Sequence, residues 1–194
     1  MKALYIAVFI LCFVLALPTP AGTQDSPNGK TAPGGMIGTK PSAPKDLLKS
    51  LVGSWEGTCT TWLESDKPAD ESRVKGEIRP ILDGRLIRHT YEGTMLGKPR
   101  HGEETLAWNA ITKRFQVSWV DTFHMRNTIL FSEGEPTDRG FIVKGKWETG
   151  PNAPAWGWNT VFEVLDEDHL TITAYVIKPD GQEKKAVETK YRRV

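Results

Sequence analysis

The sequence predicts an all-β domain, a closed antiparallel barrel of about nine or ten strands with a short helix at its N-terminal side. From residue 54 onward, apolar and polar residues alternate with a period close to two, which is the pattern of half-buried strands. Turn-forming residues interrupt this alternation at short intervals, as they do in a meander of hairpins. A sheet of so many antiparallel strands exposes two edges unless it closes on itself, so we expect a barrel.

The helix is expected before the first strand. The stretch APKDLLKSL, residues 43–51, has Pro44 and Asp46 near its start and leucines spaced along one face, which predicts a short helix that plugs one end of the barrel. Turns separate the strands that follow, and in ILDGRL the pair Asp83-Gly84 fits a two-residue hairpin. The expected strands span residues 54–63, 72–82, 85–95, 102–109, 114–121, 123–132, 140–148, 156–165, 169–178 and 182–192.

The alternation also separates inward from outward positions. In RFQVSWVD, residues 114–121, the rings of Phe115 and Trp119 share one face, and Asp121 ends that face. Large side chains collect on one face of other strands too, namely Ile87, His89, Tyr91, Phe141, Val143, Trp147, Trp156, Trp158 and Phe162. The interior of the barrel is therefore predicted to be lined with aromatic rings.

Two segments precede the domain. Residues 1–21 contain Lys2, an apolar run from Ala3 to Leu17 and small residues up to Ala21, which is the pattern of a cleaved signal peptide. This run is shorter than the roughly 20 residues that a spanning helix needs, so we predict an extracytoplasmic protein, periplasmic or secreted, with no transmembrane segment in its mature form. Residues 22–45 contain five glycines, four prolines and no aromatic residue, which predicts a disordered linker to a domain at residues 46–194.

Charge and cysteine content narrow the class of protein. Removal of residues 1–21 takes away one lysine and no acid, which leaves 24 basic and 24 acidic residues and no electrostatic sign of nucleic-acid binding. Cys59 is then the single remaining cysteine, so no disulfide forms within the mature chain. The four histidines are scattered without His-x-His or Cys-x-x-Cys spacing, and we expect neither a metal site nor a cofactor.

Several motifs resemble the bacterial domain-of-unknown-function family numbered 1579. They are LVGSWEGT at 51–58, ILDGR at 81–85, YEGTMLGKPRHG at 91–102, KRF at 113–115 and WVD at 119–121. The resemblance implies a lipocalin-like barrel of the calycin type and brings no assigned activity. It also implies that Trp55 packs across the closed end beneath Arg192 or Arg193 of the last strand, a structural role. The stretch AWN, residues 107–109, departs from the family, where a glycine, an aromatic residue and an aspartate are expected.

Asp121 and His124 invite the idea of a catalytic pair. They are three positions apart, so on one regular strand their side chains point to opposite faces and converge only across a bulge or a turn. With a new strand expected from residue 123, His124 is predicted to be a neighbour of Asp121 rather than its partner. Asp121 itself faces inward beside Trp119, and a buried carboxylate needs a hydrogen-bond partner, a place near the barrel mouth or a function.

The aromatic inner face and the export signal together predict non-enzymatic binding of a small apolar or amphipathic ligand inside the barrel. The loop ETGPNAPAWGWN, residues 148–159, is either a lid over the barrel mouth or a plain connection. The residues predicted to line the cavity are His89, Tyr91, Trp108, Trp119, Asp121, Met125, Trp147, Trp158 and Tyr175.

Three other functions compete with ligand binding. One is an enzyme that uses Asp121 or His89 as acid or base, with Tyr91 as a hydrogen-bond donor. Another is an envelope interaction module whose barrel is filled and whose outer surface binds a partner. The last is a haem-binding barrel resembling nitrobindin, but that family takes its axial histidine from the C-terminal strand, and EKKAVETKYRRV, residues 183–194, contains none. The ligand, the protein partners and the oligomeric state stay open at the level of sequence.

Overall fold

This computed structural model describes residues 43–63, 66–125 and 127–194 of the chain. The predicted signal peptide, residues 1–21, and all but the end of the predicted linker, residues 22–45, lie outside the described residues. Within the described ranges, no helix is long and apolar enough to cross a membrane.

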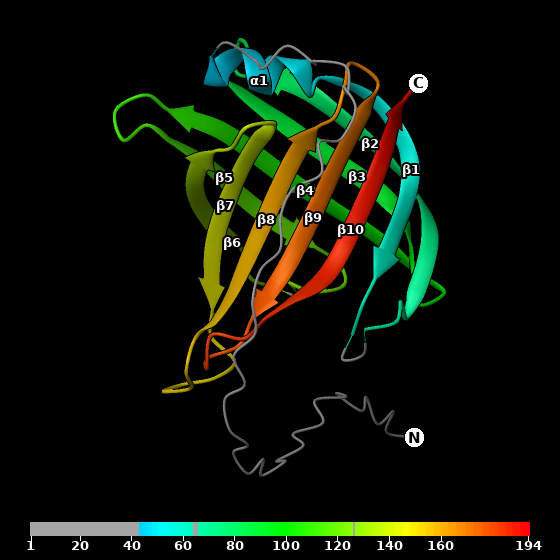
Figure 1. The fold of residues 1–194 in the computed structure, drawn as a ribbon, viewed down its shortest axis with the longest axis vertical. Coiled ribbons are helices and arrows are strands. Elements are labelled where there is room, and N and C mark those ends of the chain that lie inside the picture. The colour runs from blue at the N-terminus through cyan, green and yellow to red at the C-terminus, as the bar shows by residue number, and fades with distance from the viewer. Residues whose placement is uncertain (1–42, 64–65, 126) are drawn as a thin grey trace, which may run out of the picture. The chain divides into compact units, whose positions relative to one another are not determined.

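One short helix and ten strands make up the described part of the chain (Figure 1). The helix α1, Pro44–Ser50, carries a proline in its first turn, where the missing N–H costs no helical hydrogen bond. The strands are β1 Gly53–Thr61, β2 Asp70–Ile81, β3 Leu86–Met95, β4 Lys98–Asn109, β5 Arg114–Asp121, β6 Leu130–Pro136, β7 Gly140–Trp147, β8 Trp156–Val164, β9 His169–Ile177 and β10 Glu183–Arg193.

The ten strands form one closed barrel, and all the pairings between them are antiparallel. Consecutive strands pair with each other, and β1 pairs with β10 from Trp55 opposite Arg193 to Thr61 opposite Val187. This pairing removes the two exposed edges that an open sheet would have. The predicted fold class, a closed antiparallel barrel with a short N-terminal helix, is therefore confirmed.

Three connections differ from the prediction, and in one of them β4 begins at Lys98 rather than at residue 102. The strand expected at residues 123–132 was wrong, because β5 ends at Asp121 and β6 begins only at Leu130. The turn between β2 and β3 has four residues, 82–85, rather than two, because Ile81 pairs with Leu86. Leu82 and Asp83 have positive φ there together with Gly84, so a longer left-handed turn replaces the expected tight hairpin.

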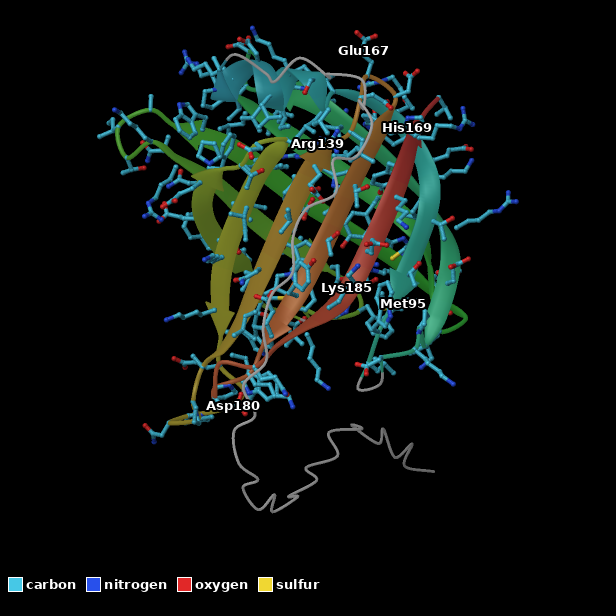
Figure 2. All side chains as sticks on the ribbon, in the orientation of Figure 1. Met95, Arg139, Glu167, His169, Asp180 and Lys185 are labelled. Carbon is cyan, nitrogen blue, oxygen red and sulfur yellow. The ribbon has the colours of Figure 1, made fainter. Side chains whose placement is uncertain are left out.

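The two ends of the barrel carry different connections. Because α1 comes directly before β1, the β2–β3, β4–β5, β6–β7 and β8–β9 turns lie at the α1 end. Figure 1 shows α1 across this end, and Figure 2 shows Arg139, Glu167 and His169 toward it, with Met95 and Asp180 toward the opposite end. This opposite end, here called the far end, carries the β5–β6 connection and the β7–β8 loop, residues 148–155.

The half of the interior next to α1 is filled with aromatic rings. Phe141 stacks on Phe115 and on Phe162, with ring centroids 4.2 and 4.5 Å apart. All three side chains are at most 1% exposed, as their predicted inward positions require. Leu47 and Leu48 of α1 belong to the same buried core. Any interior space for a ligand therefore lies nearer the far end.

Trp55 closes the α1 end beneath Arg193. The guanidinium carbon of Arg193 lies 4.1 Å from the ring centroid of Trp55, within the range of a cation–π contact. Its nitrogens donate to the backbone oxygens of Val52 at 2.6 Å, Ser50 at 2.9 Å and Glu167 at 2.8 Å. Arg193, rather than Arg192, thus makes the contact that the motif implies, and it ties β10 to the segment between α1 and β1.

Candidate functional site

A cavity of about 50 Å³ lies inside the barrel, on the far side of the phenylalanine stack. Strands β2 to β5 form one wall, and strands β8 to β10 form the facing wall. The apolar and indole side chains that line it are Val74, Trp119, Trp158, Ile172, Ala174 and Val187. The polar ones are His89, Tyr91, Arg100, Glu104, Thr160, Thr189 and Tyr191. A small space with this many polar groups suits a ligand that is part apolar and part polar.

His89 and Glu104 form a hydrogen-bonded pair in the cavity wall. They lie directly opposite each other on β3 and β4, with Nδ1 of His89 2.7 Å from Oε2 of Glu104. On its other side, Nε2 of His89 lies 3.3 Å from the Tyr191 hydroxyl. With Glu104 ionised and His89 neutral, Nδ1 donates to the carboxylate and the Tyr191 hydroxyl donates to Nε2. The chain of three groups satisfies a carboxylate that is only 7% exposed.

Tyr91 sits at the centre of a second polar group. Its hydroxyl oxygen accepts hydrogen bonds from the indole N–H of Trp119 at 2.8 Å and from Nη2 of Arg100 at 3.2 Å. The guanidinium of Arg100 also lies over the Tyr91 ring, 4.8 Å from its centroid. Gly102, directly opposite on β4, makes room for the phenol, because a Cβ there would lie 2.1 Å from the hydroxyl oxygen.

Burial raises the pKa values of both tyrosines in the cavity. For Tyr91, desolvation outweighs the opposing effects of the Arg100 charge and the Trp119 hydrogen bond, and the pKa rises far above its usual value. For Tyr191, desolvation and the nearby Glu104 carboxylate act in the same direction. Both hydroxyls therefore keep their protons at physiological pH and act as hydrogen-bond donors.

The Asp121 carboxylate is hydrogen-bonded to other residues of the barrel. Its Oδ2 accepts a hydrogen bond from Nε of Arg100 at 3.2 Å, and its Oδ1 accepts from the backbone N–H groups of Phe123 and Met125, each at 3.1 Å. Burial opposes ionisation of this carboxyl, but the hydrogen bonds and charge of His124, together with Arg100, outweigh it and lower the pKa to about 2. Asp121 is therefore a buried anion with its partners in place.

His124 does contact Asp121, contrary to the prediction that it is only a neighbour. Nδ1 of His124 lies 2.8 Å from Oδ2 of Asp121, and its backbone N–H also donates to that carboxylate. The strand ends at Asp121, and the chain turns back over the carboxylate instead of continuing as a strand. On a regular strand the two side chains would point to opposite faces, and this turn brings them together. Because Asp121 does not line the cavity, the pair shapes the β5–β6 connection.

Indole rings continue the cavity wall toward the far end. Trp119 and Trp158 stack with ring centroids 5.2 Å apart, and His124 contacts both rings at 5.5 and 5.7 Å. Trp147 lies 6.0 Å from Trp158 and 6.1 Å from Trp156. These four tryptophans form a continuous series of ring contacts from the cavity to the two strand ends that flank the β7–β8 loop.

The structure brings together part of the predicted cavity lining. Four of the nine residues line the cavity, namely His89, Tyr91, Trp119 and Trp158. Asp121, Met125 and Trp147 lie nearer the far end, and Trp108 packs on Phe115 at the α1 end, with ring centroids 4.9 Å apart. Tyr175 follows Ala174, which lines the cavity, so the alternation along β9 points Tyr175 to the opposite face.

Sequence reasoning missed several polar residues of the cavity wall, above all Arg100, Glu104 and Tyr191. The useful signal was the hairpin: counting outward from Met95 opposite Lys98 places Glu104 opposite His89 and Gly102 opposite Tyr91.

A larger hollow of about 900 Å³ lies on the outer surface of β1 to β5. It is open to solvent, and its outward-facing charges pair across the strands, as in Lys75 with Glu56 at 3.2 Å. In the described ranges, no three His, Cys, Asp or Glu side chains are arranged to hold a metal ion. The interior cavity is therefore the better candidate site.

Comparisons with known proteins agree with the fold. The family model described as "Protein of unknown function (DUF1579)" matches residues 40–193. No curated protein matches the sequence. The crystal structure of Rv2717c from M. tuberculosis has a TM-score of 0.55 at 14% identity and covers 78% of this chain and 98% of its own. The S-type phycobiliprotein lyase CPES from Guillardia theta has a TM-score of 0.49 at 12% identity, with 77% and 92% covered. The first similarity supports the barrel fold and nothing beyond it.

Proposed function

The chain belongs to the DUF1579 family, which is described as a family of unknown function, and we propose from the cavity that the protein binds a small amphipathic or apolar molecule inside its barrel without transforming it. The observation that carries this proposal is the composition of the cavity wall. Indole and aliphatic side chains offer apolar surface, while fixed hydroxyls and the His89–Glu104 pair offer a few polar groups, which is the usual make-up of a ligand site.

The size of the cavity limits the ligand. About 50 Å³ accommodates a few water molecules or a small organic molecule. A longer ligand has to displace Trp158, and the aromatic contacts of Trp147 and Trp156 offer a surface for its protruding part. We therefore expect the polar group of the ligand to lie deepest.

The test is ligand capture by the native protein. Native mass spectrometry of the purified protein should detect a retained small molecule, and a panel of small lipids and aromatic compounds should quench the emission of Trp119 and Trp158. Ala174→Leu fills the cavity and should abolish the quenching, whereas Val120→Leu, at a position 38% exposed outside the cavity, should leave it unchanged. Quenching that survives Ala174→Leu would place binding elsewhere and refute the proposal.

Export is part of the same proposal, supported by the apolar run from Ala3 to Leu17 and the small residues up to Ala21. N-terminal sequencing of the protein recovered from an extracytoplasmic fraction should find a chain that begins just after Ala21. A full-length chain confined to the cytoplasm would contradict it.

An acid–base enzyme is the second candidate, favoured by the His89–Glu104 pair in the cavity wall. The hydrogen bond between the two side chains is short, and both residues are buried. Both also line the cavity, so a bound molecule can reach the pair, as proton transfer requires. A turnover assay with captured ligands separates the two functions. Glu104→Gln should eliminate turnover while it leaves ligand capture in place, and a ligand recovered unchanged by the wild type supports binding alone.

A further inference from the structure

One cavity hydroxyl has an unused hydrogen. A phenol oxygen has two lone pairs and one O–H, and the lone pairs of Tyr91 accept from Trp119 and Arg100. The Tyr91 hydrogen has no acceptor among the residues that the structure describes, although the hydroxyl lines the cavity. Tyr91 is half-buried, and a donor in the cavity wall without an acceptor is costly, so this hydrogen calls for a partner inside the cavity.

The Tyr91 hydroxyl is also rigidly placed. Two N–H donors hold its oxygen, Arg100 lies over its ring, and the ring lies against the backbone of Gly102. Desolvation keeps the group protonated by raising its pKa. A donor that is fixed before the ligand arrives loses little freedom on binding, so it favours a ligand with an acceptor at one defined point.

The charges around the cavity disfavour an anionic ligand. Arg100 is the only arginine or lysine of the described residues that lines it, and its nitrogens are engaged by Asp121, Cys59 and Tyr91 at 3.2 to 3.3 Å. Glu104 contributes a carboxylate to the same wall. An incoming anion would therefore meet a negative group and no free cation.

A cationic ligand leaves the Tyr91 hydrogen without a partner, because an ammonium group brings only donors. Glu104 would attract such a ligand, but at the Tyr91 hydroxyl it would meet the positive charge of Arg100. Thr160 and Thr189 line the facing wall, and neither hydroxyl makes a hydrogen bond within the described residues. These hydroxyls rotate and serve as further donors to a ligand oxygen.

Resting on the proposed binding function, we propose that the ligand is an uncharged carbonyl compound whose oxygen accepts a hydrogen bond from the Tyr91 hydroxyl. A carbonyl oxygen offers two lone pairs and brings no hydrogen of its own to satisfy in an enclosed space. It replaces the water that would otherwise take the Tyr91 hydrogen. Trp119 and Trp158 then contact the apolar part of the molecule.

The test uses four probes of similar size: acetone, isopropanol, isopropylammonium and acetate. Titration of the full-length protein, followed by the NMR shift of the Trp119 indole N–H, should show acetone binding about tenfold more tightly than either ion and more tightly than isopropanol. The ¹³C resonance of the bound carbonyl should move downfield, as it does on accepting a hydrogen bond. Equal affinities, a preference for isopropanol or an unshifted carbonyl would overturn the assignment.

Variants of the two tyrosines locate the donor. Tyr91→Phe should weaken acetone binding about tenfold and return the carbonyl resonance toward its free position. Tyr175→Phe is the matched control, because Tyr175 lies on the opposite face of β9 from the cavity, and it should change the affinity less than threefold. The wild-type carbonyl shift decides the matter if Tyr91→Phe does not fold.

The outcomes separate this assignment from the proposed function. Probes that enter the cavity without preference for acetone refute the carbonyl class and leave binding in the barrel intact. If no probe binds and no molecule is retained by the native protein, both proposals fail.

Discussion

Asp121 carries a buried negative charge whose partners come from two elements. Arg100 reaches it from β4, and the backbone of the β5–β6 connection closes over it from the other side. Its side chain is fully buried, so each of these partners replaces a hydrogen bond to water. Removing the charge leaves Arg100 without its counter-ion and the connection without its acceptor.

Replacement of Asp121 by asparagine should therefore lower the free energy of unfolding by about 3 kcal/mol at neutral pH, as breaking a buried ion pair does. The effect depends on pH. Since the folded-state pKa of about 2 is below the usual value, the charge stabilises the fold above about pH 4, and this contribution is lost as the pH falls toward 2. Urea denaturation at several pH values should show roughly 2 kcal/mol of acid-dependent stability in the wild type that Asp121→Asn lacks.

A surface pair provides the control for that experiment. Asp166 and His169 have the same spacing and the same 2.8 Å contact as Asp121 and His124, but their side chains are exposed. Asp166→Asn should leave the unfolding free energy and its dependence on pH close to those of the wild type, because solvent screens an exposed pair. Parallel acid profiles for the wild type and Asp121→Asn would contradict the assignment of the acid-sensitive group.

Gly102→Ala should destabilise the barrel by about 2 to 4 kcal/mol, because the added methyl group would lie 2.1 Å from the hydroxyl oxygen and Cζ of Tyr91. Gly150→Ala, with open space around its Cβ position, should stay within about 0.5 kcal/mol of the wild type. Thermal unfolding followed by circular dichroism measures both. A Gly102→Ala protein as stable as the wild type would mean that the phenol does not depend on this gap.

The inward or outward position of a single residue was predictable from the sequence only where the alternation along one strand determines it. The inward positions of Phe115, Trp119 and Asp121 follow from the parity of one strand and agree with their burial. Prediction of the Glu104–His89 contact requires the β3–β4 register. Pro99 and Gly102 are residue types typical of loops, so the sequence pattern did not reveal that β4 begins at Lys98. The contact of Arg100 with Cys59 needs β1, which lies far away in sequence, and no local pattern specifies it.

The β5–β6 connection, residues 122–129, shows why elements are misassigned. Phe123 and Met125 alternate with polar residues, which gives the segment the period of a strand. The Asp121 carboxylate instead accepts the N–H groups that a strand would have paired with a neighbour. Local side-chain hydrogen bonding thus overrides a strand-like periodicity in this segment.

Arg193 holds α1 and β10 together, so its loss should be felt at the element scale. Arg193→Ala should cost about 2 to 3 kcal/mol, because it removes three hydrogen bonds to backbone oxygens and the contact over Trp55. Arg192→Ala, which removes a single 3.5 Å contact, should be nearly neutral. Chemical denaturation compares them, and equal losses for the two variants would deny Arg193 its special role.

On the scale of the whole molecule, closure leaves no strand at an edge within the described part. Amides of β1 and β10, such as those of Cys59 and Thr189, should therefore exchange hydrogen as slowly as the amides of β5, within about tenfold. The amide of Leu82, a residue of the β2–β3 turn that is 66% exposed, provides the fast reference. Rapid exchange at alternate positions of β1 would indicate an open sheet.

The barrel as a whole was predictable because strand number, short turns and amphipathic alternation leave few other ways to bury one face. The size of the interior space was not. It depends on how Phe115, Phe141 and Phe162 stack across strands that are distant in sequence, and on the glycines that let the tyrosines lie flat. Packing of this kind is set in three dimensions and leaves no periodic trace.

The pairing of β1 with β10 has a consequence for biosynthesis. β1 ends at Thr61, and its partner strand ends at Arg193, so about 130 residues are translated after β1 before its second edge has a partner. At about 5–20 residues per second, a nascent chain carries that unpaired edge for roughly ten seconds. During this interval the edge is open to pairing with another nascent chain. Folding of this barrel thus waits for the ribosome to reach the last strand, and a chaperone that shields β1 would act within that time.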